Sequence, residues 1–350
     1  MIKLEEYLRL CDEESLIKDR SYKKVEEPKI SIITPVLNKR NTIKRYLKSI
    51  QNQNFQNLEI IFIDDKSDDD SIKIIKELQK EDERIILIKN KKRKGTLISR
   101  KLGAYKSKGE YLLFVDPDDI ISENIINYTY KLAKKFDFDF IRYNIYIGNF
   151  KLNLADIVCK IQNKLLYKPN IFLFLFYGFG RLLQLDYYIT NKLIKKKLFI
   201  KALNSIDKFY LEQFMVDCED GLVNFMIYKL SKSMYFTRKI GYYYIITKKS
   251  ITNDETGNFK NRLKSNFLYF NFIFTATKNN NIEKEIANNI FYEVYIRRPE
   301  IIINLLKDLS DDHEFYLKTI NLFLNNDFIP LSSKTILQEL KEAIKPSTII

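Results

Sequence analysis

Residues 111–119 read YLLFVDPDD, five large apolar residues followed by three carboxylates within four positions. Similar short apolar runs precede this stretch at 30–34, 58–63 and 85–88. Each run ends in polar or turn-forming residues, which predicts a strand buried in a parallel sheet. Between and after the runs, apolar residues recur at helical spacing and predict four helices, over 43–50, 72–78, 95–107 and 123–136.

This alternation of strands and helices predicts an α/β fold with right-handed βαβ units and a Rossmann-type sheet flanked by helices. The charged residues 1–27 are expected to form a helical or irregular extension. The main domain is expected to cover 28–255, with a first half over 28–150 and a less regular second half over 151–255. Residues 256–350 are expected to be helical, because apolar residues there recur at four-residue steps.

The composition restricts the class of protein. The 350 residues carry a formal charge of +14, which would suit nucleic acid, anionic lipid or phosphorylated substrates. We favour lysines spread over solvated faces for most of this excess, and we expect no nucleic-acid partner. The sequence does not indicate the oligomeric state.

The cysteines and the apolar segments indicate a compartment. Three cysteines far apart in the sequence suggest neither a disulfide framework nor a zinc site and fit a reducing compartment: Cys11, Cys159 and Cys218. The apolar window 171–177 is too short for a bilayer, which needs roughly 20 apolar residues. We therefore expect a cytoplasmic protein, and contact with the inner face of the membrane stays open.

Carboxylates follow two of the predicted strands. Asp64 and Asp65 end the second run, and Asp116, Asp118 and Asp119 follow the fourth. In parallel sheets ligands bind beyond the carboxyl ends of the strands, so these side chains are expected at one edge. The 116–119 segment suits a hard divalent cation bridged to phosphates, or a simple turn. Likewise, Asp65 suits a contact to a nucleoside or a cap of the next helix.

Four motifs in order resemble those of the family 2 glycosyltransferases. They lie at 32–38 (IITPVLN), 63–69 (IDDKSDD), 99–103 (SRKLG) and 108–119 (KGEYLLFVDPDD), within about a quarter of the chain. The resemblance implies a GT-A fold that binds a nucleotide-sugar donor, with a UDP-sugar favoured, together with Mn²⁺ or Mg²⁺. Two positions depart from the family pattern: Leu37 replaces a frequent aromatic residue, and Lys101 replaces a frequent Asn.

The resemblance also assigns residues to roles. Pro35 and Leu37 are expected to line the base site, Asp65 to contact the base, and Arg100 to lie near the diphosphate or ribose. The three carboxylates of the acidic segment are expected to hold ribose and metal, with Asp119 as an alternative ligand to the first two: Asp116, Asp118 and Asp119.

A further acidic element, Asp217 to Asp220, resembles the segment that supplies the catalytic base of the family. A carboxylate there would take the proton of the acceptor hydroxyl as it attacks the anomeric carbon opposite the leaving diphosphate. We predict Asp220 as this base, with Glu219 and Asp217 as alternatives. The other interpretation is an acidic first turn of a helix.

The resemblance therefore implies an inverting, metal-dependent glycosyltransferase that acts on a glycan or lipid-linked acceptor. Two other classes stay open. A nucleotidyltransferase on a related fold should carry a glycine-rich phosphate loop after the first strand, and residues 35–40 contain no glycine. A non-catalytic basic binding module would have no use for ordered acidic clusters, since carboxylates repel phosphate unless a metal intervenes.

Overall fold

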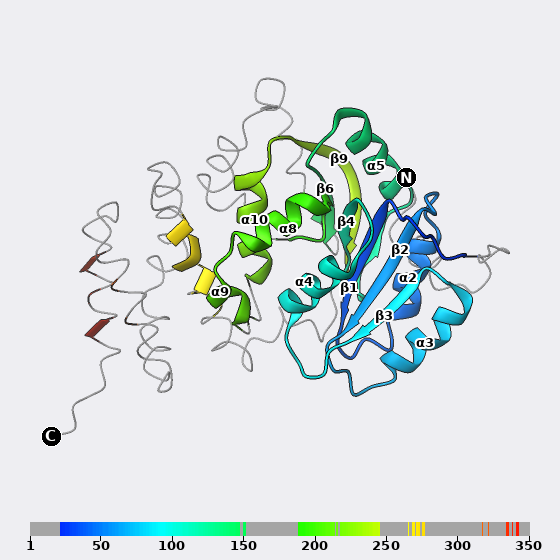
Figure 1. Ribbon diagram of the computed structural model, residues 1–350, viewed down its shortest axis with the longest axis horizontal. Coiled ribbons are helices and arrows are strands. Elements are labelled where there is room, and N and C mark those ends of the chain that lie inside the picture. Colours follow the sequence, from blue (N-terminus) through cyan, green and yellow to red (C-terminus); the bar gives the residue numbers. More distant parts are fainter. Residues whose placement is uncertain are drawn as a thin grey trace. The chain divides into compact units, whose positions relative to one another are not determined.

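The computed structural model describes residues 22–147, 150–151, 188–213, 215 and 218–245, with scattered helical positions between 265 and 342 (Figure 1). The chain divides into two compact units. The first comprises Met1–Pro169, Tyr188–Glu212 and Leu230–Ser250, and the second Asn170–Tyr187, Gln213–Lys229 and Ile251–Ile350.

The first unit begins with the predicted parallel strands. Strand β1 pairs in parallel with β2 on one side and β4 on the other, and β3 extends the sheet beyond β2. The four strands are β1 (Ile30–Val36), β2 (Leu58–Asp64), β3 (Ile85–Lys89) and β4 (Tyr111–Phe114). The connecting helices are α2 (Ile43–Gln51), α3 (Ser71–Glu81) and α4 (Thr96–Lys106), and α5 (Ile125–Phe136) follows the acidic segment. The predicted elements are confirmed to within a few residues.

Beyond β4 the sheet becomes mixed. The described residues form nine strands in the order β3-β2-β1-β4-β8-β6-β9-β5, with β7 paired to β6. Strand β8 runs antiparallel to both β4 and β6, whereas β9 is parallel to β6 and antiparallel to β5. These elements are β5 (Ile120–Ile121), β6 (Phe140–Ile147), β7 (Phe150–Lys151), β8 (Lys192–Lys195) and β9 (Met234–Tyr244), with helices α8 (Lys196–Asn204) and α9 (Lys208–Glu212).

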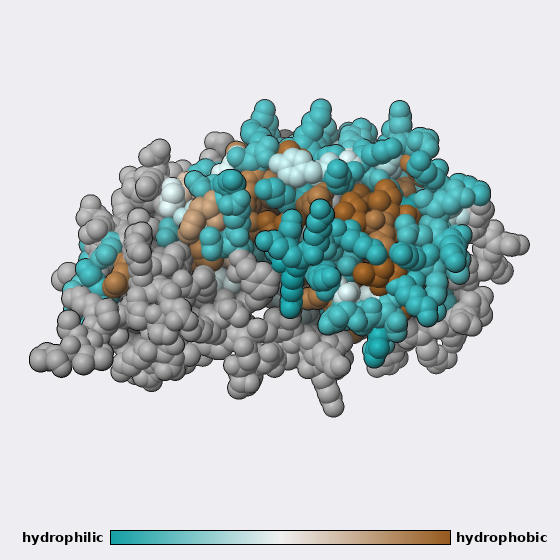
Figure 2. All heavy atoms as spheres, turned by 60° about the horizontal axis from the view of Figure 1, so that its bottom comes forward, coloured by the Kyte–Doolittle hydropathy of each residue, from teal (hydrophilic) through white to brown (hydrophobic). Residues whose placement is uncertain are grey.

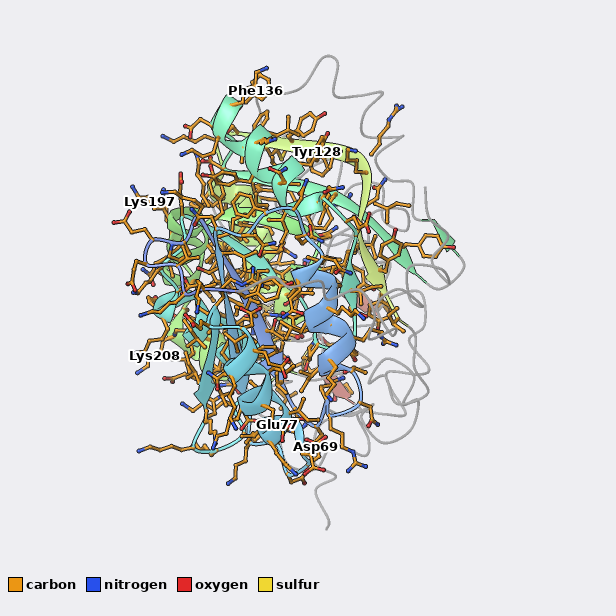
Figure 3. The ribbon with its side chains drawn as sticks, turned by 90° about the vertical axis from the view of Figure 1, so that its right-hand side faces the viewer. Asp69, Glu77, Tyr128, Phe136, Lys197 and Lys208 are labelled. Carbon is orange, nitrogen blue, oxygen red and sulfur yellow. The ribbon has the colours of Figure 1, made fainter. Side chains whose placement is uncertain are left out.

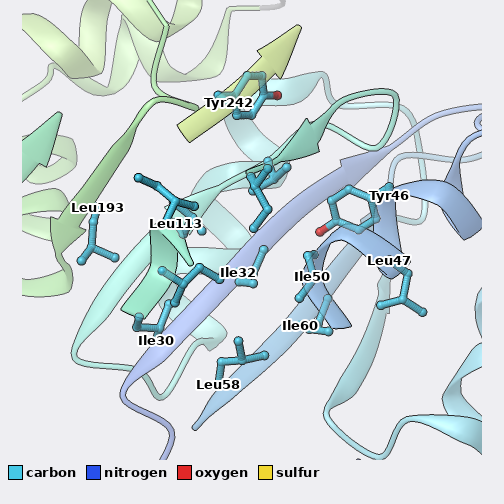
Figure 4. Packing of buried hydrophobic residues seen from close by; sticks show 14 of the residues in the cluster. Ile30, Ile32, Tyr46, Leu47, Ile50, Leu58, Ile60, Leu113, Leu193 and Tyr242 are labelled. Atoms are coloured by element: carbon cyan, nitrogen blue, oxygen red, sulfur yellow. The ribbon is translucent and has the colours of Figure 1, made fainter. Parts of the chain in front are cut away.

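The core lies along both sides of the parallel strands. Ile32, Ile60 and Leu113 pack with Tyr46 and Ile50 of α2 (Figure 4). On β1, β2 and β4 almost every residue is buried, which is the pattern of a sheet covered on both faces. The continuous apolar runs of these three strands have this origin, whereas β3 lies at the edge of the sheet and is partly exposed.

Glycine at position 103 lets α4 lie close against the sheet. A Cβ at Gly103 would lie 2.5 Å from Cγ2 of Ile33 and 2.8 Å from Cδ1 of Ile63. Real Cβ atoms do not approach other atoms so closely, so any side chain there would push α4 away from β1 and β2. The close packing fixes where Arg100, three residues earlier on α4, meets the edge of the sheet.

Lysines cover the outer faces of the first unit. Lys197 and Lys208 are exposed and extend from the same side of the first unit (Figure 3). On the face shown in Figure 2, hydrophilic residues cover most of the described surface and border smaller hydrophobic areas. The exposure of Lys197 and Lys208 agrees with the expectation that lysines lie on solvated faces.

The second unit is helical wherever it is assigned regular structure. Helix α10 (Glu219–Leu230) starts immediately after Cys218, whose φ of 60° places it in the left-handed region. Phe225 packs edge-on against Phe272 at 5.9 Å between ring centroids, and Lys229 donates to the carbonyl of Ala276 at 2.7 Å. The described positions of 256–350 are helical, as predicted. Within the described part of the chain, no helix is long and apolar enough to cross a bilayer.

Candidate functional site

Both acidic segments lie at the carboxyl edge of the sheet, on either side of β1. The backbone N–H of Asp65 donates to the carbonyl of Val36 at 2.8 Å, just past the end of β2. On the other side, the N–H of Val115 donates to the carbonyl of Ile33 at 3.3 Å, just past the end of β4. The strand order therefore brings together two carboxylate clusters, of which Asp65 and Asp116 are 51 positions apart in the sequence.

Asp65 organises the start of α4. Its Oδ1 accepts hydrogen bonds from Nδ2 of Asn90 and from the N–H of Lys94, and its Oδ2 accepts one from the N–H of Gly95, each at 2.8 Å. Gly95 has φ 86° and ψ 170°, a conformation that only glycine adopts without strain. The side chain of Asp65 thus fixes the loop before α4 and does not cap α3. One lone pair of Oδ2 stays available to a further donor.

The side chain of Asp69 caps the first residue of α3. Asp70 precedes the helix but makes no side-chain capping bond. Instead, Oδ1 of Asp69 accepts from the N–H of Ser71 at 2.9 Å, and Oδ1 of Asp64 accepts from the N–H of Ser67 at 3.1 Å. These two carboxylates therefore order the loop between β2 and α3.

The acidic segment after β4 is a tight turn. The N–H of Asp119 donates to the carbonyl of Asp116 at 3.1 Å, and Pro117 occupies the second position, where its fixed φ suits a turn. The turn and a ligand site are compatible, because Asp116 and Asp118 stay partly exposed while Asp119 is buried.

Tyr242 of β9 holds this turn in place. Its hydroxyl donates to Oδ2 of Asp119 at 2.6 Å and accepts the N–H of Asp116 at 3.2 Å. The N–H of Ile245 donates to Oδ1 of Asp119 at 2.8 Å. Burial, with smaller contributions from the neighbouring Asp118 and Asp116, raises the pKa of Asp119 well above its ordinary value. Both oxygens of Asp119 are therefore engaged inside the protein.

Three cationic side chains surround the other two carboxylates. Arg100 donates to Oδ1 of Asp116 at 2.8 Å, and Nζ of Lys39 lies 2.5 Å from Oδ2 of Asp118. Arg45 of α2 donates to the carbonyl of Asp118 at 3.3 Å, and its buried Nε has no hydrogen-bond partner among the described residues. Cations thus offset the repulsion between the carboxylates.

The donor set suits a hard divalent cation. Among the described residues no three His, Cys, Asp or Glu side chains are grouped as a complete metal site. Mg²⁺ and Mn²⁺ need fewer protein ligands, because they keep several waters and take one or two carboxylates together with substrate phosphates. The ammonium of Lys39 contacts Oδ2 of Asp118, which shows that this oxygen can be reached by a cation. The residues present therefore fit such an ion.

The remaining predicted residues lie in both units. Pro35 and Leu37 are half-buried where β1 ends and the next loop begins. Glu219 and Asp220 form the first turn of α10, which belongs to the second unit. Their role as catalytic base therefore stays a prediction. Asp217 lies outside the described residues.

Sequence reasoning missed three residues of the site. Arg45 and Tyr242 carry no local motif. The only feature of the sequence that could have indicated Lys39 is its position shortly after the first strand.

The sequence of the domain that contains this site matches a known family. Residues 31–202 match the model of the family described as glycosyl transferase family 2. This segment forms a family 2 glycosyltransferase domain. The family 2 domain includes the whole parallel half of the sheet and the acidic turn.

Two curated relatives and one solved structure extend the comparison. The GalNAc(5)-diNAcBac-PP-undecaprenol beta-1,3-glucosyltransferase of Campylobacter jejuni is 41% identical over 93 residues, which is 26% of this chain and 30% of the relative. The poly(ribitol-phosphate) beta-glucosyltransferase of Bacillus spizizenii is 29% identical over 221 residues, 62% of this chain and 32% of the relative. The matched segments thus span about a third of these relatives.

The fold is GT-A-like. The structure of S. aureus TarS 1-349 in complex with UDP-GlcNAc has a TM-score of 0.61 to this chain at 15% identity, covering 90% of each chain. The family 2 domain and its mixed sheet therefore confirm the predicted fold class.

Proposed function

We propose that this chain transfers a sugar from a UDP-sugar to a hydroxyl group of a glycan or lipid-linked acceptor, with inversion at the anomeric carbon. The observation that carries the proposal is the turn 116–119, whose two partly exposed carboxylates lie at the carboxyl edge of a family 2 domain, across β1 from Asp65. The relatives reported above are named as glycosyltransferases, which favours sugar transfer over nucleotidyl transfer and over non-catalytic binding.

The donor would be held between the two acidic segments. Pro35 and Leu37 would line the base, and the free lone pair of Asp65 would accept a donor group of the base. Asp116 would accept ribose hydroxyls, and Arg100 would hold Asp116 in position while facing the diphosphate. Because Arg100 is almost completely buried, its guanidinium is positioned before the ligand arrives.

A divalent cation, Mn²⁺ or Mg²⁺, would be held by Asp116 and Asp118. Its chemistry is the neutralisation of charge that develops on the departing diphosphate. Asp118 is the better candidate than Asp119, because both oxygens of Asp119 already accept hydrogen bonds within the protein.

Asp220 would act as the base of the transfer, with Glu219 as the alternative. The carboxylate would accept the proton of the acceptor hydroxyl as its oxygen attacks the anomeric carbon. Attack from the face opposite the leaving diphosphate inverts the configuration. Because the three separated cysteines fit a reducing compartment, we place the reaction in the cytoplasm or at the inner face of the membrane.

The direct test is a donor screen by UDP release with UDP-GlcNAc, UDP-glucose and UDP-galactose. With the preferred donor and Mn²⁺, Asp118→Asn and Asp220→Asn should each lower kcat/KM by about a hundredfold or more. Asp70→Asn is the matched control, since Asp70 is exposed and makes no capping bond. Full activity in both site variants would contradict the assignments, and pyrophosphate release from a nucleoside triphosphate would favour the nucleotidyltransferase.

A further inference from the structure

We infer that Lys39 is an internal counter-cation that occupies Asp118 until a divalent cation displaces it, and that Lys39 thereby sets the affinity of the site for that cation. The inference rests on the proposed function, which gives Asp118 the role of metal ligand. It concerns a residue outside the acidic motif, 79 positions earlier in the sequence.

The backbone of Lys39 is firmly anchored. Its N–H donates to Oγ of Ser71 at 2.8 Å, and its carbonyl accepts from the N–H groups of Thr42 and Ile43 at the start of α2. The preceding Asn38 has φ 54°, and its N–H donates to Oγ of Ser67 at 3.1 Å. The loop after β1 is thus tied to the loop before α3, so the long side chain of Lys39 can leave Asp118 without any change of the backbone.

Asp118 differs from its neighbours in the kind of partner that it has. Asp116 is paired with Arg100, whose side chain is only 5% exposed, and Asp119 is held by Tyr242 inside the protein. The Lys39–Asp118 pair is more open, with side-chain exposures of 32% and 22%. A compact ammonium on a flexible stem is the easiest of these partners to replace.

Displacement follows from electrostatics. A divalent cation on Oδ2 of Asp118 and an ammonium 2.5 Å from the same oxygen would repel each other at a separation of a few ångströms. A divalent cation can therefore bind Asp118 only if the Lys39–Asp118 ion pair breaks. For a partly exposed pair this competition amounts to about a two- to fivefold loss of affinity.

The test is a titration of the full chain with Mn²⁺, in which free Mn²⁺ is followed by its electron paramagnetic resonance signal. Lys39→Met should lower the Kd for Mn²⁺ by about two- to fivefold, because nothing then competes for Asp118. Lys39→Arg should stay close to the wild-type Kd, since it keeps the charge. The matched control is Arg40→Met, which removes one positive charge from the same loop at an exposed side chain whose charge acts on Asp69.

The outcomes separate this inference from the proposed function. An unchanged or weaker Mn²⁺ affinity of Lys39→Met overturns it, even if UDP release by the wild type proceeds as proposed. An equal gain in affinity in Arg40→Met also overturns it, because the effect would then be one of net charge. If neither the wild type nor Lys39→Met binds Mn²⁺ while the wild type still releases UDP, the counter-cation role of Lys39 and the metal requirement are both wrong. The proposal of sugar transfer would still stand.

Discussion

Replacing Tyr242 with Phe isolates the contribution of one hydroxyl to the acidic turn. The aromatic ring stays buried in the core, so the apolar packing is kept. The change removes the donor to Oδ2 of Asp119 at 2.6 Å and the acceptor of the Asp116 N–H at 3.2 Å. The carboxylate of Asp119 then keeps only the bond from the N–H of Ile245.

The expected loss of stability follows from these two bonds. A hydrogen bond to a charged group contributes about 1.5–3 kcal/mol, and an ordinary one about 0.5–1.5 kcal/mol. Tyr242→Phe should therefore lower the free energy of unfolding by about 2–4 kcal/mol where Asp119 is ionised. The loss should be nearer to 1–2 kcal/mol where Asp119 is protonated, because both bonds are then between neutral groups.

The pH dependence has a definite sign. Burial and the nearby Asp118 and Asp116 raise the pKa of Asp119, so the folded protein keeps a proton that the unfolded chain has lost. Stability therefore falls as the pH rises from the ordinary carboxyl pKa towards the raised one. The bond from Tyr242 lowers the pKa of Asp119, so removing the hydroxyl raises this pKa further and increases the loss with pH.

The assay is urea unfolding of the full chain followed by far-UV circular dichroism, since the sequence contains no Trp. The control is Tyr105→Phe, which removes a 2.6 Å hydrogen bond to Asn204 at a residue that is 47% exposed. The control should cost less than about 1 kcal/mol at every pH. Equal losses in the two variants, with no change between pH 5 and pH 8, would refute the reasoning.

Three further substitutions test the site loop, the packing of α4 and a buried ion pair at the opposite edge of the sheet, by the same unfolding assay. Gly95→Ala should cost about 1–3 kcal/mol, because φ 86° is strained for alanine, and should loosen the loop held by Asp65; no loss would contradict the described backbone. Gly103→Ala should cost about 1–3 kcal/mol by overpacking α4 against the sheet, and a stabilised variant would show that the helix can shift. Arg84→Met should cost about 3–5 kcal/mol, because it leaves the buried carboxylate of Asp82 unpaired, and a neutral effect would show that water reaches that carboxylate.

The parallel half of the fold could be predicted because its sequence pattern is local. Buried strands read as continuous apolar runs, and a carboxylate directly after such a run must lie at the carboxyl edge. Asp65 and Asp116 were found in this way. The mixed half could not be predicted, since β6, β8 and β9 pair residues about 50 to 100 positions apart, and no local pattern in the sequence specifies such pairings.

The partners of the acidic turn were hidden for the same reason. Tyr242 reaches Asp119 across 123 positions, and Lys39 reaches Asp118 across 79. No local pattern encodes such contacts. The sequence could show that Asp116, Asp118 and Asp119 lie together, but only the burial of Asp119 separates the carboxylate that holds the turn from the two that face outward.

Calorimetric titration with UDP, in the presence and absence of Mn²⁺, tests most directly whether the acidic turn holds a nucleoside diphosphate through a cation. We predict that UDP binds the wild type only with Mn²⁺, and that Asp118→Asn weakens this binding by about tenfold or more while Asp70→Asn leaves it unchanged. UDP binding of equal strength without metal and in Asp118→Asn would contradict the account.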